Sequence, residues 1–169
     1  MKRILLHTCC APCTTAVHEW MLQNDFDVTG FFFNPNIHPR EEHEKRRNTL
    51  SQYSILKNLP VIYSDVYMEE DYRAKGKKDC SFCYELRLEA TAKLAKEEGY
   101  DCFSTTLLIS PYQDHENLKE IGQRMAEKYG ISFFYHDFRL DFRRSQTLAK
   151  ELGLYRQKYC GCLYSITYK

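Results

Sequence analysis

Long hydrophobic runs are absent from this sequence of 169 residues. The longest, such as Phe31-Phe32-Phe33 and Val61-Ile62-Tyr63, fall far short of the roughly 20 apolar residues that span a bilayer. The start of the chain carries positive charge but neither an apolar stretch nor a small-residue cleavage site, so we do not expect a secretory signal. The sequence therefore predicts a cytoplasmic protein with no membrane partner.

A strong net charge is also lacking. Lys and Arg number 24 against 23 acidic residues, which leaves a formal charge of +1. A nucleic acid would therefore have to be bound by a local patch. Such a patch is present near the end of the chain, because the segment from about 136 to 169 contains seven Lys or Arg and only three acids. We expect Arg143, Arg144 and Arg156 to contact the phosphates of an RNA.

A glycine-rich phosphate loop is the third absence. Apolar runs of strand length alternate with helical patterns, which predicts one α/β domain over residues 1–169, with a mainly parallel sheet. Nucleotide-binding proteins of this architecture place glycines between the first strand and the first helix. Residues 7–13 read His-Thr-Cys-Cys-Ala-Pro-Cys at that position. Cysteines replace the glycines, so binding of ATP phosphates at this turn is not expected.

The element boundaries follow from the periodicity of apolar residues. We expect strands at 4–7, 28–33, 61–63, 102–109 and 131–135, and helices at about 12–24, 39–57, 81–98, 114–129 and 145–152. In the helix over 81–98, a stripe repeating every four residues is expected to be buried: Phe82, Leu86, Ala90 and Leu94. A parallel sheet binds its ligand at the carboxyl ends of its strands, which is where the cysteines fall.

Cysteine is the residue in excess, with eight in the chain. In a reducing cytosol, clustered cysteines are more often metal ligands or catalytic thiols than disulfides. Seven of them form three groups, which are Cys9, Cys10 and Cys13; Cys80 and Cys83; and Cys160 and Cys162. Cys102 stands alone and is expected to be a buried strand residue, because a free cysteine packs as a small hydrophobe.

Cys9-Cys10 and Cys80-x-x-Cys83 together offer four thiolates from two loops. This set suits a zinc ion or a 4Fe-4S cluster, and a purely thiol site is a third interpretation. Spacing favours the iron-sulfur cluster, because Cys9-Cys10 is a poor zinc knuckle. Cys13 follows Pro12 near the start of a helix, where a thiolate is favoured.

Cys160-Gly161-Cys162 is a different kind of motif. Two cysteines separated by one residue close only a small, strained disulfide ring, and Gly161 supplies the backbone freedom for it. Because strained disulfides are the labile ones, the motif favours a redox couple. Two further metal ligands are the alternative.

Other polar residues have more ordinary explanations. Asp114 could reach a substrate or simply cap a helix. His7 is typical of a hydrogen-bonded core histidine, and its position beside Cys9 leaves a functional role as the alternative. Three tyrosines could stack on an unpaired base: Tyr112, Tyr155 and Tyr159. Five basic residues are expected to form a solvated surface: Arg46, Arg47, Lys75, Lys77 and Lys78.

Taken together, five blocks resemble the cobalamin-independent epoxyqueuosine reductase family, QueH. They are the segment 7–13, Phe33-Asn34-Pro35-Asn36-Ile37-His38-Pro39, Cys80-Ser81-Phe82-Cys83-Tyr84 with Arg87-Leu88, Thr105-Thr106-Leu107-Leu108 with Ser110-Pro111-Tyr112-Gln113, and Tyr155-Arg156-Gln157-Lys158-Tyr159-Cys160-Gly161-Cys162. The combination of CCxxC, CxxCY and YCGC is highly specific. The blocks occur in order along the sequence, and the match covers nearly the whole chain.

The resemblance implies a nucleotide-binding alpha-hydrolase-like fold and the last step of queuosine formation in tRNA. In that step, an epoxide is reduced to an alkene by two electrons and two protons. The implied cofactors are a 4Fe-4S cluster on Cys9, Cys10, Cys80 and Cys83 and an adjacent iron to which Cys13 contributes, without cobalamin. The implied partners are tRNA carrying epoxyqueuosine at the wobble position and a separate electron donor.

Two rival functions share some of these features. A tRNA sulfur-transfer enzyme of the same α/β group would use the cysteines to carry persulfide, but it needs a phosphate loop to activate the base with ATP. A zinc-stabilised RNA-binding module would explain four cysteines and the basic segment. It would leave Cys160-Gly161-Cys162 without a role.

Overall fold

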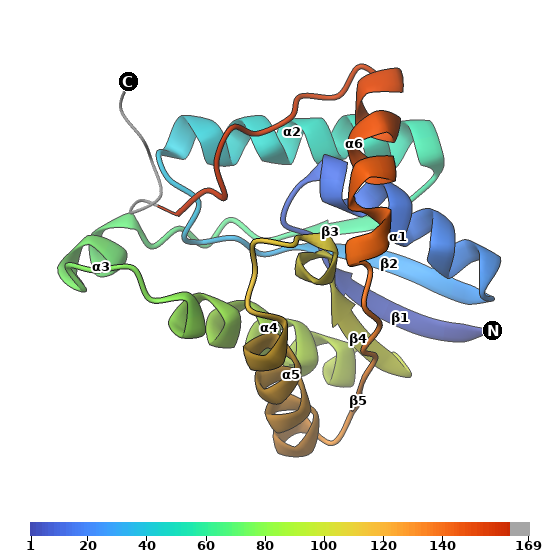
Figure 1. The fold of residues 1–169 in the computed structure, drawn as a ribbon. Helices are drawn as coiled ribbons and strands as arrows, with labels where there is room; N and C mark the ends of the chain where they lie inside the picture. The colour runs from blue at the N-terminus through green and yellow to red at the C-terminus, as the bar shows by residue number, and fades with distance from the viewer. Residues whose placement is uncertain (163–169) are drawn as a thin grey trace.

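A five-stranded, fully parallel sheet forms the centre of the molecule in a computed structural model that describes residues 1–162 (Figure 1). The strands lie in the order β3-β2-β1-β4-β5, and all neighbouring pairs are parallel. Their bounds are Lys2–His7 for β1, Phe26–Phe32 for β2, Val61–Tyr63 for β3, Cys102–Thr105 for β4 and Ser132–Phe133 for β5. The predicted α/β fold class is confirmed.

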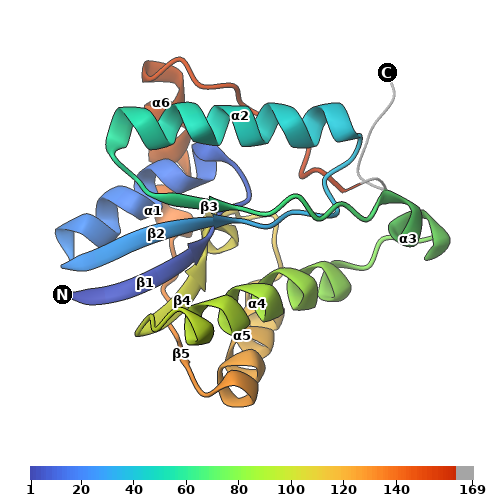
Figure 2. The ribbon, with the colours of Figure 1, turned by 180° about the vertical axis from the view of Figure 1, so that it is seen from behind.

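Helices cover both faces of this sheet. Their bounds are Ala11–Gln23 for α1, Arg40–Lys57 for α2, Glu69–Ala74 for α3, Cys80–Glu97 for α4, His115–Tyr129 for α5 and Phe142–Glu151 for α6. Two short 3₁₀ turns, η1 and η2, span Thr106–Ile109 and Arg139–Asp141. Helices α1, α2 and α6 lie on one face, and α4 and α5 lie on the other (Figures 1 and 2).

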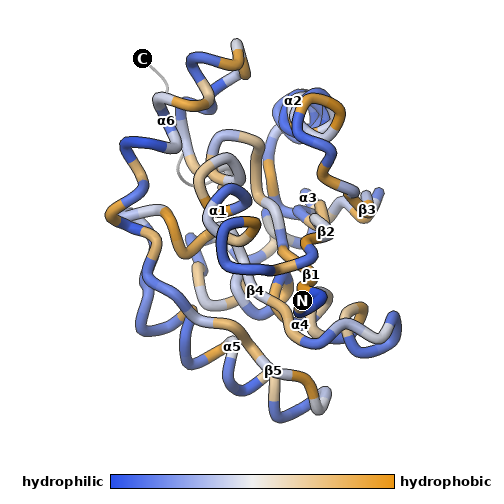
Figure 3. The backbone as a smooth tube through the Cα atoms, turned by 90° about the vertical axis from the view of Figure 1, so that its right-hand side faces the viewer, coloured by the Kyte–Doolittle hydropathy of each residue, from blue (hydrophilic) through white to orange (hydrophobic). Residues whose placement is uncertain are grey.

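The hydrophobic core lies between these layers. Ile4, Leu5 and Leu6 of the central strand β1 are fully buried, because both faces of a parallel sheet are covered by helices. Hydrophobic residues recur along the strands, whereas hydrophilic residues dominate the outer turns of the helices (Figure 3). Cys102 is buried in β4, as predicted. Among the described residues, no helix combines the length and the apolar character needed to cross a membrane.

Three local predictions were wrong. The strand expected over 102–109 ends at Thr105, where the Thr105 side chain accepts a hydrogen bond from the Leu107 amide and starts η1. The polar stretch after β3 contains α3, which the sequence pattern did not indicate. The stripe expected to be buried on α4 is only half-buried. The fully buried face of that helix lies beside it, and its side chains include Tyr84, Leu88 and Ala92.

Candidate functional site

The site lies where the strand order reverses. Strands β1 and β4 are neighbours in the sheet, yet their connections lead to opposite faces, so their carboxyl ends leave a crevice between them. Cys9 follows β1, and Thr106 follows β4. The Thr106 hydroxyl accepts a hydrogen bond from the Cys9 amide at 3.2 Å and lies 3.4 Å from the Cys9 Sγ. The loop in which cysteines replace glycines is thereby fixed to the end of the neighbouring strand.

His7, the last residue of β1, fixes the start of the same loop. Its Nε2 donates to the Phe33 carbonyl and the Asn34 Oδ1, both at 3.1 Å, so its Nδ1 accepts from the Thr105 hydroxyl at 2.9 Å. Burial, followed by the charge of Arg87, lowers the pKa of His7 to about 4. A neutral, fully hydrogen-bonded histidine is a structural residue, which agrees with the core position expected from the sequence.

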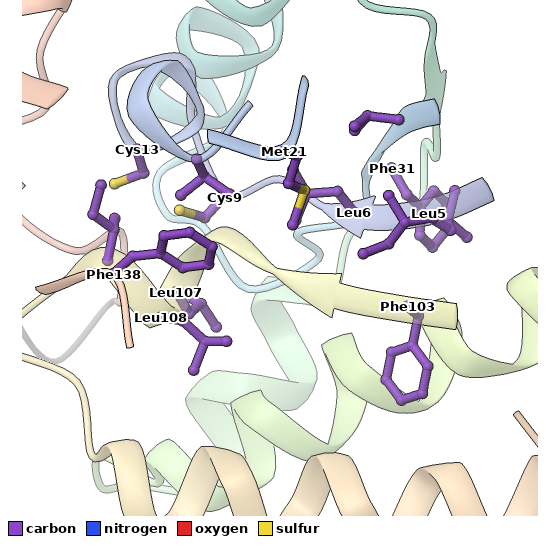
Figure 4. Packing of buried hydrophobic residues seen from close by; sticks show 14 of the residues in the cluster. Leu5, Leu6, Cys9, Cys13, Met21, Phe31, Phe103, Leu107, Leu108 and Phe138 are labelled. Carbon is purple, nitrogen blue, oxygen red and sulfur yellow. The ribbon is translucent and has the colours of Figure 1, made fainter. Parts of the chain in front are cut away.

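Three thiols converge at the start of α1. In the part of the chain from 1 to 162, Cys9, Cys10 and Cys13 form the one group of three or more potential metal-ligand side chains whose ligand atoms all lie within 4.8 Å of one another. The Sγ atoms of Cys9 and Cys10 are 3.8 Å apart. Figure 4 shows the Cys9 and Cys13 side chains at the start of α1, near Leu107.

The three thiols shift one another's pKa values. Hydrogen bonds from Cys10 and Cys13 hold the pKa of the Cys9 thiol well below its usual value. Burial raises the pKa of Cys10 to about 12, and the hydrogen bond to Cys10 raises the pKa of Cys13. Cys9 is therefore the most acidic thiol of the group, and a metal ion that binds there displaces the protons of the thiols that it contacts.

The second cysteine pair begins α4. Asp79 caps this helix by accepting a hydrogen bond from the Phe82 amide at 3.0 Å. Cys80, Cys83 and Arg87 are spaced by three and four residues, so they share one face of the helix. Both Cys80 and Cys83 line the cavity described below, together with Cys9 and Cys13.

Residues 155–162, which we call the strap, bring the third cysteine group to the other two. Cys162 is buried and packs against Cys83. At the other end of the strap, the Gln157 Nε2 lies 2.9 Å from the Cys10 Sγ and 4.0 Å from the Cys13 Sγ. Cys160 lies at the surface and also lines the cavity.

One cavity of about 510 Å³ joins these groups. Six thiols line it: Cys9, Cys13, Cys80, Cys83, Cys160 and Cys162. Four cationic side chains line it as well: Arg46, Lys78, Arg87 and Lys158. No Asp or Glu of residues 1–162 lines this cavity. The cavity wall is therefore electropositive, which favours thiolates and other anions inside it.

The predicted residues fall into two sets around this cavity. All four proposed cluster ligands lie at it or, for Cys10, in the thiol group beside it, and Tyr112 stands at its wall with 84% of its surface exposed. Asp114 caps α5 by accepting a hydrogen bond from the Asn117 amide. Three arginines expected to bind RNA are exposed and do not line the cavity: Arg143, Arg144 and Arg156.

Sequence reasoning missed two arginines. Arg46 was expected on a solvated surface, and this prediction was wrong, because its side chain is only 1% exposed. Arg87 is also buried, and its Nε and Nη2 both donate to the Asn36 Oδ1. The four-residue spacing of Cys83 and Arg87 on one helix is the signal that could have drawn attention to Arg87.

The fold and the site define a class of parallel α/β proteins in which a thiol-lined cavity occupies the place of a phosphate loop. The family model of epoxyqueuosine reductase QueH matches residues 4–168. The epoxyqueuosine reductase QueH of Thermotoga maritima is 39% identical, with 98% of this chain and 91% of that protein aligned. The protein of the same name from Dehalococcoides mccartyi is 36% identical over 96% of this chain and 92% of its own length. The chain therefore belongs to the QueH family.

A solved structure with a related fold is the U34-tRNA thiolase NcsA from Methanococcus maripaludis, which contains a [4Fe-4S] cluster. It superposes with a TM-score of 0.63 at 12% identity over 98% of this chain, and this chain spans 62% of that one. At this identity, the likeness concerns the fold alone.

Proposed function

We propose that this protein reduces epoxyqueuosine in tRNA to queuosine. The observation that carries the proposal is the cavity in which three separate cysteine groups meet four cations, with no Asp or Glu among the lining residues that the structure describes. Membership of a family of reductases with this name supports the same conclusion. Thiols in such surroundings are suited to hold a metal centre and to transfer electrons.

The donor set fits a 4Fe-4S cluster. Cys9, Cys10, Cys80 and Cys83 supply the four thiolates that such a cluster requires, and Cys13 is available for an adjacent iron. The surrounding arginines and lysines offset the negative charge of thiolates in a buried place. When bound, these groups would supply single-electron transfer and a Lewis acid for the epoxide oxygen. Zinc on the same thiols would supply no electrons.

Cys160 and Cys162 provide the stoichiometry that the reaction needs. Removal of the epoxide oxygen as water consumes two electrons and two protons. Oxidation of the two thiols to a disulfide releases two electrons and two protons, so epoxide and dithiol become alkene, disulfide and water. A separate dithiol reductant would then restore both thiols. The contact of Cys162 with Cys83 gives these electrons a short path to the cavity.

The mouth of the cavity suits an unpaired nucleotide. Tyr112 is largely exposed, and its ring meets the edge of the Phe142 ring at a centroid distance of 6.0 Å. Both rings line the cavity, as do the exposed Lys78 and Lys158. An aromatic platform beside cations is typical of sites that stack a base and bind its phosphate.

An assay without oxygen tests the proposal. Protein loaded with iron and sulfide is expected to convert epoxyqueuosine in tRNA to queuosine, with the loss of one oxygen measured by nucleoside mass spectrometry. Cys80→Ser and Cys83→Ser are expected to lower both iron content and conversion, whereas Cys102→Ser, remote from the cavity, is the matched control. Active protein that holds stoichiometric zinc and no sulfide would contradict the cluster. Loaded protein that leaves the epoxide intact would contradict the reaction.

A further inference from the structure

Arg46, a buried side chain of α2, binds the backbone of the strap. Arg46 lies beneath it, and its guanidinium donates through Nη1 to the Cys160 carbonyl at 2.9 Å and through Nη2 to the Tyr159 carbonyl at 2.7 Å. The same guanidinium lies 5.5 Å from the centre of the Tyr159 ring. Two successive carbonyls, those of the first cysteine of the motif and of the residue before it, are therefore fixed by one planar group. The strap is the red segment that runs beside α2 in Figure 1.

Gly161 fits against this guanidinium as no other residue can. A Cβ atom at this position would lie 2.9 Å from the Arg46 Nη1 and 3.0 Å from the Ile37 Cγ1. Its φ of +104° lies in the region that side chains rarely adopt. The Gly161 carbonyl in turn accepts from the His38 amide at 2.8 Å. The glycine thus allows the backbone of the motif to rest directly on Arg46.

Glu42 links Arg46 to the start of the strap through hydrogen bonds of its carboxylate. It accepts from the Arg46 Nε at 3.0 Å and from the Tyr155 hydroxyl at 3.0 and 2.9 Å. One carboxylate therefore orients the guanidinium and holds the start of the strap at the same time. Arg46 keeps its two Nη groups for the carbonyls, and its positive charge faces the thiols of the cavity.

We propose that Arg46 is the positioning residue of the Cys160-Gly161-Cys162 pair, and that it holds the backbone so that the two sulfurs can close their ring beside Cys83. The proposal rests on the redox role proposed above for that pair. The two electrons still come from the two thiols, which lose two protons as the disulfide forms. Arg46 takes no part in the electron transfer, but it restricts the strap to conformations in which the sulfurs meet.

The experiment compares Arg46→Gln and Arg46→Lys with Arg47→Gln, the same change one residue away on a side chain that pairs with Asp65 instead. Metal-free protein is equilibrated with mixtures of a reduced and an oxidised dithiol, and mass spectrometry of the C-terminal peptide measures the Cys160–Cys162 disulfide. Arg46→Gln is expected to lower the equilibrium constant for ring closure about tenfold, because it removes hydrogen bonds from a charged donor. That change corresponds to about 30 mV. Arg46→Lys is expected to lie between the wild type and Arg46→Gln.

Activity gives the second measurement. In loaded protein that has been reduced beforehand, Arg46→Gln is expected to slow repeated turnover about tenfold more than it slows a single turnover. A ring-closure constant equal to that of Arg47→Gln would overturn the proposal. Loss of iron from Arg46→Gln would also overturn it, because Arg46 would then support the metal site. The ring-closure measurement needs no tRNA, so an inactive wild type would refute the proposed function without affecting this result.

A second variant covers the case in which Arg46→Gln does not fold. Gly161→Ala leaves α2 unchanged and pushes the strap away from the guanidinium through its new methyl group. It is expected to lower the ring-closure constant as Arg46→Gln does, with wild-type circular dichroism. An unchanged constant in folded Gly161→Ala would show that the contact with Arg46 does not position the pair.

Discussion

Arg87 is a buried cation in the wall of the cavity. Its guanidinium is buried and donates twice to the Asn36 amide oxygen. In the described part of the chain, no carboxylate lies within 4.0 Å of it. A buried cation without an acidic partner is costly unless an anion faces it. Arg87 lies one turn after Cys83 on α4, so the thiolates of the proposed cluster would be that anion.

The position of Arg87 leads to a prediction at the residue scale. Arg87→Gln is expected to shift the midpoint potential of the bound cluster downward, on the order of tens of millivolts, because removal of a positive charge disfavours the added electron. A spectroscopic redox titration measures the shift. Arg87→Lys is expected to retain most of the potential, and Lys93→Gln, exposed on the same helix, serves as the control. An unchanged potential in Arg87→Gln would show that its charge does not reach the cluster.

At the scale of elements, the packing of α5 on β5 leaves no room for a methyl group. A Cβ atom at Gly122 would lie 2.4 Å from the ring of Phe133. Alanine normally stabilises a helix by roughly 0.5–1 kcal/mol relative to glycine, but a clash with a buried ring costs about 1–3 kcal/mol. Gly122→Ala is therefore expected to lower the free energy of unfolding, measured by chemical denaturation. Phe133→Leu in the same chain should recover part of that decrease. If the effects of the two substitutions on the free energy of unfolding simply add, the clash is not the cause.

The contact between α1 and α2 should make stability depend on pH. His18 of α1 lies 2.8 Å from the Tyr53 hydroxyl of α2, and burial lowers the pKa of His18 to about 4. Between about pH 6.5 and pH 4, the unfolded chain binds a proton at His18 that the folded chain does not. The free energy of unfolding should then fall with decreasing pH, by up to about 1.4 kcal/mol per pH unit from this group.

Denaturation at a series of pH values measures this dependence. His18→Gln is expected to make the curve less steep between pH 6.5 and pH 4, because it removes the contribution of His18 to the proton uptake, whereas His7, whose pKa is also about 4, still contributes. His136→Gln, at a half-buried histidine stacked on Trp20, is the matched control. Parallel curves for the wild type and His18→Gln would show that this histidine does not account for the decrease in stability.

At the scale of the whole molecule, binding of RNA depends on how the basic residues are distributed around the carboxyl edge of the sheet. Arg143, Arg144 and Arg156 are all exposed, and Arg144 also pairs with Glu19 at 2.6 Å. Charge reversal at all three is expected to weaken tRNA binding. It should also reduce the slope of log affinity against log salt concentration by roughly 0.7–0.9 for each phosphate that the protein no longer neutralises. Lys57→Glu, at the opposite edge of the sheet, is the control. Unchanged affinity at low and moderate salt would identify the patch as a solvated face.

The sequence by itself determined the class of fold and the location of the site. Fully apolar short strands alternating with helices are stable only when helices cover both faces of a parallel sheet. The first loop and the CxxC at the start of α4 lie near strand ends, where such a sheet binds its ligands. For this reason the cysteine groups could be assigned to one edge without coordinates.

Only the tertiary structure decided which charged residues belong to the site. On α2, the sequence from Arg40 to Arg47 is typical of a polar, solvated helix, because nothing nearby in the chain can cover it. The strap, about 110 residues later, lies over its first turns and buries Arg46 against the carbonyls of Tyr159 and Cys160. Helical periodicity describes contacts within a turn or two, whereas burial by a distant segment depends on how the whole chain closes. The same reason explains why the buried face of α4 differs from the stripe expected from its apolar residues.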